Sequence, residues 1–321
     1  MRRFRPARRG AGAILLAAGA GLAFCAAAAA DAVTVRDATG RDVTVSDPSR
    51  IVAVGGAITE ILYALGLEDR IVAVDTTSLH PPRALKEKPN VGYMRQLSPE
   101  GVLGLSPSLV LATDAAGPKE AVAVLAAAAV PYVRVGDAFT AESILDKVRL
   151  VATAAGARAR GECLAQQVAA DLAAVAALRA RVTEPLRVMF VMSFLNGRAM
   201  VGGRNTGADG IIRLAGAVNA ADSVEGYRLI TDEAVIAARP DVVLAMRRSH
   251  DAVAAETVFA HAAFAPTPAA ARRAFVAMDG LYLLGFGPRT ARAARDLAAT
   301  LYPSLQPGAL PSERAPRDCG A

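Results

Sequence analysis

The stretch that decides the fold occurs twice in the chain: Leu97-Ser98-Pro99-Glu100, and 133 positions later Ile230-Thr231-Asp232-Glu233. In both copies a Ser or Thr suited to a helix N-cap precedes an acid in the first helical turn, where the helix dipole favours negative charge. Each predicted helix is followed by a proline and an apolar strand, at 106–111 and 239–244, and the two copies align without a gap. The repeat therefore predicts two lobes of similar topology with a cleft between them.

Outward from the repeat, short apolar strands alternate with helices, which indicates parallel sheets covered on both faces. In the first lobe we expect strands at 50–54, 70–74, 109–112 and 131–135, with helices at 59–65 and 119–129. A β-hairpin is expected at 32–45, because valines alternate there around Gly40. The second lobe opens with a strand at 187–192 and a helix at 206–214, and closes with a helix at 290–301. Ligands of such sheets bind beyond the carboxyl ends of the strands.

A helical segment at 140–185 separates the two α/β patterns. Thr140 caps a helix that runs to Ala155, Gly156 interrupts it, and a second run extends from Arg158 to about Arg181. At about 1.5 Å per residue these 24 residues reach roughly 36 Å, the width of a small domain, so we interpret the run as a bridge between lobes. An ordinary surface helix is the alternative. The predicted fold is α/β: two Rossmann-like lobes joined by a long bridging helix, with a ligand cleft between the lobes.

The predicted organisation of the chain has five parts. They are a signal peptide at 1–30, an N-terminal lobe at 31–139, the bridging segment at 140–185, a C-terminal lobe at 186–302 and a disordered tail at 303–321. Residues 1–30 combine five arginines, an apolar run and a row of alanines, the layout of a cleavable secretory signal. A lipoprotein anchored through Cys25 is the alternative, although Phe24 stands where such signals place a small residue.

The basic charge of the chain belongs largely to that first segment. Lysine and arginine exceed aspartate and glutamate by 36 to 30, but five of the arginines lie in residues 1–30, which leaves a net charge near +1 for the remainder. Nucleic-acid binding gains no support from so small a charge. No stretch after residue 30 is apolar for the about 20 residues that a transmembrane helix needs.

Two cysteines remain beyond residue 30. Cys163 falls in a predicted helix and Cys319 in the proline-rich tail, so pairing requires the tail to fold back. We expect two unpaired thiols, and their spacing suggests no zinc site.

Tyr93 and Arg95 lie on an exposed connection that ends where Ser98 begins a helix. A phenol titrates near ~10, and a ferric ion or a nearby guanidinium stabilises its phenolate form. Tyrosinate is also an accepted axial ligand of haem. The pair is therefore a candidate iron site, whereas a half-buried packing tyrosine is the alternative.

The run Val91-Gly92-Tyr93-Met94-Arg95, followed by Leu97-Ser98-Pro99-Glu100-Gly101, resembles the signature of periplasmic haem-binding proteins that supply ABC-type haem importers. Residues 54–61, 202–209 and 278–290 resemble the same family, so the likeness covers roughly residues 33–302. It implies a class III periplasmic substrate-binding protein of the HmuT type. The fold is shared with siderophore and cobalamin carriers, so the haem assignment depends on fewer residues than the fold does.

This resemblance implies a role for several residues. Tyr93 would be the axial ligand of ferric haem, with Arg95 as its partner or in contact with a propionate. Further haem contacts are expected from Met94, Phe194, Met246, Arg247, Arg248 and His250. Phe194 and Met246 are equally compatible with core positions, and the arginine pair with a solvated surface. Because no other histidine suits a second ligand, five-coordinate haem is expected, with one or two haems per chain left open.

The resemblance also implies partners. Glu100 and Glu233 would meet arginines of an inner-membrane ABC permease with its ATPase, although both also stabilise helix N-termini. We expect a periplasmic monomer that binds no nucleic acid.

Other functions stay in view. A siderophore or cobalamin carrier would keep the fold and the glutamates without needing Tyr93 and Arg95, and a haem-storing or sensing protein would need no permease. We expect no enzyme, because the chain shows no nucleophilic serine elbow, no metal-binding histidine pair and no cofactor loop.

Overall fold

The computed structural model describes residues 1, 32–247, 253–314 and 318–319. Of two units, Met1–Ala30 and Asp31–Ala321, the second is described below. The expected signal peptide, including Cys25, lies outside the described residues. Within the described part of the chain, no helix combines the length and apolar content needed to cross a membrane.

The first lobe contains a parallel sheet with the strand order β4-β3-β5-β6. Its strands are β3 (Ile51–Val54), β4 (Ile71–Val74), β5 (Leu109–Thr113) and β6 (Tyr132–Val135), and they are buried almost throughout because both faces of the sheet are covered. Its helices are α1 (Gly56–Ala64), η1 (Glu68–Arg70), α2 (Ala84–Glu87), α3 (Pro99–Leu103) and α4 (Lys119–Ala127). A hairpin of β1 (Val33–Arg36) and β2 (Asp42–Val45) precedes them.

Helix α1 begins earlier than the sequence predicts. Gly55, at a φ of 121° that side-chain-bearing residues rarely adopt, turns the chain straight out of β3 into a helix that starts at Gly56 rather than Thr59. The early start brings α1 close to the second lobe. A Cβ atom on Gly56 would lie 2.4 Å from Thr77 O and 2.6 Å from Leu281 Cδ1, and the backbone oxygen leaves room only for glycine.

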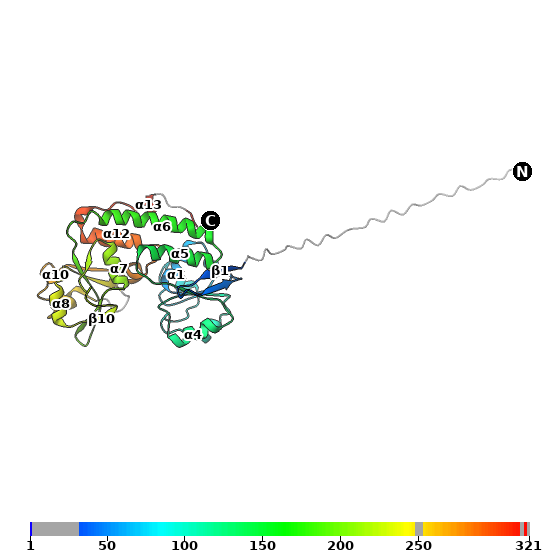
Figure 1. The fold of residues 1–321 in the computed structure, drawn as a ribbon, viewed down its shortest axis with the longest axis horizontal. Helices are drawn as coiled ribbons and strands as arrows, with labels where there is room; N and C mark the ends of the chain where they lie inside the picture. Colours follow the sequence, from blue (N-terminus) through cyan, green and yellow to red (C-terminus); the bar gives the residue numbers. More distant parts are fainter. Residues whose placement is uncertain (2–31, 248–252, 315–317, 320–321) are drawn as a thin grey trace. The chain divides into compact units, whose positions relative to one another are not determined.

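Two helices connect the lobes. Thr140 caps α5 (Ala141–Ala154) as predicted, its hydroxyl accepting a hydrogen bond from Ser143 N. Helix α6 (Arg158–Arg179) follows, and its 22 residues span about 33 Å. It packs against α5 at one end and against helices of the second lobe at the other (Figure 1), which makes it the bridging helix.

The second lobe contains a mixed sheet with the order β10-β8-β7-β11-β12, in which β9 also pairs with β7. Its strands are β7 (Arg187–Leu195), β8 (Arg198–Gly202), β9 (Val218–Asn219), β10 (Tyr227–Leu229), β11 (Val242–Arg247) and β12 (Phe275–Asp279). Its helices are α7 (Gly207–Leu214), α8 (Asp232–Ala238), α9 (Ala255–Ala260), α10 (Pro268–Ala271), α11 (Gly280–Leu284) and α12 (Thr290–Leu301). Strands β7, β9, β11 and β12 are parallel, whereas β8 and β10 run antiparallel to their neighbours.

The β7–β8 hairpin was not predicted, although its signal is present. Asn196 and Gly197 form the two-residue turn, both with positive φ, and Asn-Gly is the strongest short hairpin signal.

The lobes share one hydrophobic core that continues through α5 and α6. At their junction Phe139 and Phe286 make an edge-to-face contact with ring centroids 5.2 Å apart. A Cβ atom on Gly210 would lie 2.6 Å from Phe286 Cζ, so the junction depends on close packing against glycine. Each sheet has a second, smaller core on its other face.

The expectation of a disordered tail was wrong for the residues that the structure describes. The segment contains η2 (Pro303–Leu305) and α13 (Pro311–Arg314), and it packs along α6. Leu310 is 3% exposed, and Ser312 N donates to Asp171 Oδ1 over 2.9 Å. The expectation of unpaired thiols was also wrong, because Cys319 forms a disulfide with Cys163 of α6. These contacts hold a segment whose prolines alone suggested disorder.

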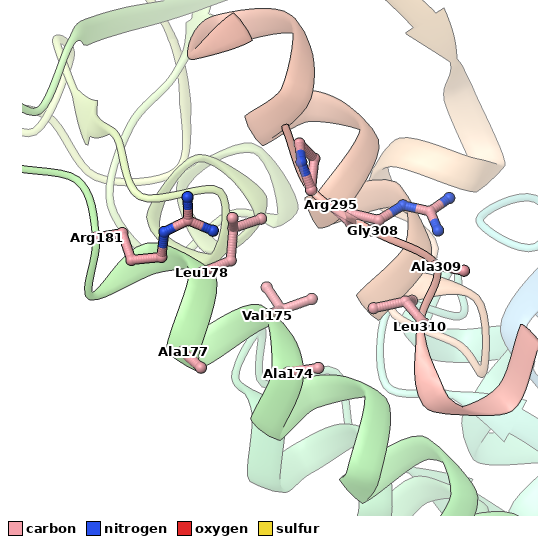
Figure 2. A pocket seen from close by; sticks show the side chains of 10 residues that line it. Ala174, Val175, Ala177, Leu178, Arg181, Arg295, Gly308, Ala309 and Leu310 are labelled. Atoms are coloured by element: carbon pink, nitrogen blue, oxygen red, sulfur yellow. The ribbon is translucent and has the colours of Figure 1, made fainter. Parts of the chain in front are cut away.

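A cavity of about 190 Å³ lies between α6 and this tail (Figure 2). Small and aliphatic side chains line most of it, together with Arg181 and Arg295. Arg181 Nη2 donates to Leu305 O, and Arg295 forms ion pairs with Asp296 and Glu313. None of the expected haem contacts lines this cavity.

Candidate ligand-binding site

The loop that carries Tyr93 is held by backbone hydrogen bonds on both sides. Upstream, Val91 N donates to Val74 O and Thr76 N donates to Gly92 O, both over 3.0 Å, so the loop runs beside the end of β4. Downstream, Gly117 N donates to Met94 O over 2.9 Å. Gly92, at a φ of 90°, lets the chain turn between these anchors. Tyr93 therefore projects from a fixed backbone.

Tyr93 is a large, exposed side chain on this loop, with 41% of its surface accessible. Among the described residues, no hydrogen bond or ion pair joins Tyr93 to Arg95 or Arg247. Arg95 is likewise exposed, and it forms no ion pair with any described residue. Tyr93 and Arg95 are thus both accessible to a ligand.

Arg95 acts on a residue that the sequence did not single out. Burial raises the pKa of Tyr227, while Arg95 and the hydrogen bonds to Ala208 and Thr206 act in the opposite direction. Tyr227 belongs to β10 of the second lobe, so the Arg95 guanidinium lies close enough to influence a phenol of that lobe. No local sequence pattern identifies Tyr227, because Arg95 and Tyr227 are far apart in the sequence and act on each other only in the folded chain.

Three expected haem contacts lie mainly against protein. Met94 is half-buried and packs on the core beneath the first sheet, and Met246 is only 8% exposed. Phe194, at the end of β7, is partly exposed and stacks on His261 with ring centroids 5.1 Å apart. Met246 is therefore a core residue, as the alternative interpretation of the sequence expected, whereas the Phe194 side chain is partly accessible to solvent.

The second-lobe cations are only partly described. Arg247 ends β11 and is exposed, in register with Asp279 of β12. Arg248 and His250 lie outside the described residues. No group of three or more His, Cys, Asp or Glu side chains is placed to hold a metal ion in the part of the chain that the structure covers.

The other histidines have structural surroundings. His261 Nε2 lies 2.6 Å from Gly197 O, and its Nδ1 accepts a hydrogen bond from Ala263 N, so the ring supports the β7–β8 hairpin. Burial and then Arg289 lower the pKa of His80 from its ordinary value.

Glu100 and Glu233 occupy equivalent places in the two lobes. Each is exposed at the second residue of its helix, α3 or α8. The predicted caps are confirmed, because Ser98 Oγ accepts from Gly101 N and Thr231 Oγ1 accepts from Ala234 N. Hydrogen bonds from its own amide and from Thr231 lower the pKa of Glu233, which keeps that carboxylate ionised.

Together these features define a class of protein: a two-lobed α/β binding protein whose lobes are joined by a long helix, with accessible tyrosine and arginine side chains on a fixed loop. The chain belongs to the periplasmic binding protein family, whose model matches residues 51–281. This match spans strands of both sheets and the bridging helix.

Two solved structures are similar over most of their length. The apo periplasmic heme-binding protein RhuT from Roseiflexus sp. RS-1 is 41% identical, covers 80% of this chain with 99% of its own, and gives a TM-score of 0.75. The periplasmic heme-binding protein BhuT, solved in complex with two hemes, is 40% identical, covers 80% of this chain with 98% of its own, and also gives 0.75.

Relatives found by sequence are more distant. YvrC of Bacillus subtilis, named as an uncharacterised ABC transporter substrate-binding lipoprotein, is 27% identical over 84% of this chain and 86% of its own length. A vitamin B12-binding protein from Pectobacterium atrosepticum is 28% identical over 61% of this chain and 71% of its own. The chain thus resembles both heme-binding and vitamin B12-binding proteins.

Proposed function

We propose that this protein binds ferric haem between its lobes and delivers it to an ABC-type haem permease. The observation that carries the proposal is Tyr93: an exposed phenol on a fixed loop, two residues from an exposed arginine. The similarity to heme-binding RhuT and BhuT supports the same ligand.

The chemistry follows from the phenol. At neutral pH only about one phenol in a thousand is ionised without help, given a pKa near ~10. A ferric ion and a guanidinium both favour the phenolate, so iron binding and deprotonation of Tyr93 reinforce each other. Arg95 would supply the cation from the same loop. An anionic oxygen ligand also selects ferric over ferrous iron, and tyrosinate is an accepted axial ligand.

The rest of the haem requires apolar contact and cations for its propionates. Leu79, on a loop of the first lobe, and Leu195, the last residue of β7, are exposed by 50% and 51% and would lie against the porphyrin. Arg95 and Arg247 are exposed cations suited to carboxylates. We favour five-coordinate haem held by Tyr93 alone. Because BhuT was solved in complex with two hemes, a stoichiometry of two haems per chain is the alternative for this protein.

Delivery to the permease would use Glu100 and Glu233. Exposed ion pairs contribute only ~0 to 1 kcal/mol each, which suits a carrier that must dock, unload and leave. The similarity to an ABC transporter substrate-binding lipoprotein supports a permease partner and a location outside the cytoplasm. We further propose that the carrier is a monomer exported by a cleavable signal, that its permease works with an ATPase, and that it catalyses no reaction.

A visible absorption titration of the mature protein with ferric haem tests this function. We expect a saturable high-spin spectrum of the tyrosinate type in the wild type and its loss in Tyr93→Phe. Tyr63→Phe is a matched control from the same lobe, because the Tyr63 hydroxyl is buried without a hydrogen-bond partner and is not expected to contact the ligand.

A cobalamin carrier is the second candidate, favoured by the likeness to vitamin B12-binding proteins. If the wild type gives only the spectrum of free haem but binds cobalamin, that carrier function replaces the haem proposal; a siderophore carrier is tested in the same way. Haem binding without any permease interaction would instead indicate a storing or sensing protein.

A further inference from the structure

Asp75 is a fully buried carboxylate at the carboxyl end of β4, with 0% of its surface exposed. It forms no ion pair with any lysine, arginine or histidine among the described residues. A buried carboxylate without a counter-charge is costly unless hydrogen bonds satisfy its oxygens. Its presence therefore calls for a physical reason.

Four donors converge on this carboxylate. Gly55 N donates to Oδ1 over 2.8 Å, and Ser78 Oγ donates to the same oxygen over 3.1 Å. Thr77 N donates to Oδ2 over 2.9 Å, and the Thr77 hydroxyl lies 2.8 Å from Oδ2 and 3.0 Å from Oδ1. Asp75 thus fixes the turn 75–78 and also the glycine that starts α1.

The same turn reaches the Tyr93 loop on both sides of the phenol-bearing residue. Thr76 N donates to Gly92 O over 3.0 Å, immediately before Tyr93. Thr77 Oγ1 lies 4.0 Å from Met94 Sδ, immediately after it. The turn also holds α1, because Gly56 N donates to Thr77 Oγ1 over 3.0 Å and the hydroxyls of Ser78 and Thr59 share a hydrogen bond of 2.7 Å.

We propose that Asp75 is a positioning residue for the Tyr93 ligand: its carboxylate fixes the turn 75–78, and the turn holds the backbone just before the phenol and contacts the Met94 side chain just after it. This inference rests on the proposed haem-binding function. An iron ligand held in place before binding loses less freedom on binding, which raises affinity and slows release.

The negative carboxylate is required because all four groups around it are donors. Asparagine has the same shape but replaces one acceptor oxygen with an NH₂ group. In either orientation that NH₂ group faces backbone N–H donors, those of Gly55 or of Thr77. Asp75→Asn is therefore expected to loosen the turn while keeping the volume of the side chain.

The test compares Asp75→Asn with Asp37→Asn. Asp37 is also buried in the first lobe, at 4% exposure, and accepts hydrogen bonds from the Thr39 and Arg41 amides, but these lie in the β1–β2 turn. Amide hydrogen exchange is measured first on the ligand-free proteins. We expect exchange at residues 92–97 to become about tenfold faster in Asp75→Asn and to stay at the wild-type rate in Asp37→Asn.

The second readout uses ferric haem. Haem dissociation is expected to accelerate about tenfold in Asp75→Asn, because changes to residues that support a metal ligand typically weaken the site by about ten- to a hundredfold. The iron–phenolate charge-transfer band should also become weaker. Asp37→Asn should match the wild type in both. Thr77→Val, which removes only the hydroxyl that donates to Asp75 and accepts from Gly56 N, gives the same changes if Asp75→Asn does not fold.

The outcomes separate the two proposals. If the wild type shows no Tyr93-dependent haem spectrum, the haem function fails, while faster exchange confined to residues 92–97 still supports positioning by Asp75. Unchanged exchange at 92–97, or equal acceleration in Asp37→Asn, overturns the positioning role. So does a wild-type haem release rate and charge-transfer band in a folded Asp75→Asn protein.

Discussion

Arg289 of the second lobe forms an ion pair with Glu60 of the first, with 2.9 Å between Nη2 and Oε2. The Arg289 amide also donates to the other carboxylate oxygen over 3.1 Å. The side chain of Glu60 is 7% exposed and that of Arg289 is 23% exposed, while the guanidinium also covers the Tyr282 ring at 5.1 Å. This pair joins α1 to the start of α12 directly, and so it fixes the junction between the lobes.

Glu60→Ala is expected to destabilise the protein by about 3 kcal/mol, because it leaves a largely buried guanidinium unpaired. Urea unfolding measures the change. Glu256→Ala is the matched control, since Glu256 pairs with Arg273 at 3.8 Å with both side chains well exposed. The control should lose little stability. Equal losses in the two variants would show that the junction pair is no stronger than a surface pair.

Stability should fall as the solution is acidified, in part through His80. Burial and the nearby Arg289 lower its pKa, and the opposing Glu60 and Asp279 do not cancel this effect. At pH values between the lowered pKa of His80 in the folded protein and its ordinary value of about 6.5, the unfolded chain binds more protons than the folded protein does. The free energy of unfolding therefore rises with pH across this interval, and the protein is less stable at lower pH. The urea midpoint in His80→Gln should therefore change less between pH ~5 and pH ~7.5 than that of the wild type. Identical pH profiles would refute this contribution.

Breaking the disulfide should release the tail from α6. Cys319→Ser removes a cross-link between residues 156 apart and should cost about 3 kcal/mol of unfolding free energy. Calorimetry or urea unfolding measures the loss, and amide exchange near Leu310 and Ser312 should accelerate. Cys163→Ser should give the same loss, and the double variant no more, because one bond is removed in each case. Additive losses would mean that the two thiols act separately.

Reversing both charges, Glu100→Lys with Glu233→Lys, should slow haem transfer to the permease more than about tenfold, because close like charges repel across an interface. The affinity of the carrier for haem should stay unchanged. Transfer to the importer in membrane vesicles measures the first effect and absorption titration the second. The control reverses Glu120 and Glu256, which are exposed outside the repeated helix starts. Transfer that survives the first double reversal would remove the docking role.

The sequence was most informative where local chemistry is sufficient. Ser98 and Thr231 mark helix starts because a cap needs only its own neighbours, and the apolar strands of both lobes follow from composition and spacing. The Asn196-Gly197 hairpin carried a local signal that could have been used.

The remaining features depend on residues far apart in the chain. The pairing of Cys163 with Cys319, and the burial of Leu310, require a tail that docks on a helix formed more than a hundred residues earlier. Asp75 is marked by no motif, because its importance lies in four donors that converge only in the folded lobe. Tyr93 was found from its chemistry together with a family resemblance, and its exposure agrees with the proposed role.

The central claim is that Tyr93 provides the iron ligand. Resonance Raman spectroscopy of the ferric haem complex, excited in the charge-transfer band, tests it most directly. Phenolate vibrations coupled to iron are expected in the wild type and in Tyr63→Phe, and their absence in Tyr93→Phe. If they persist in Tyr93→Phe, another phenol holds the iron, with Tyr227 the first to examine, and the account given for this site is contradicted.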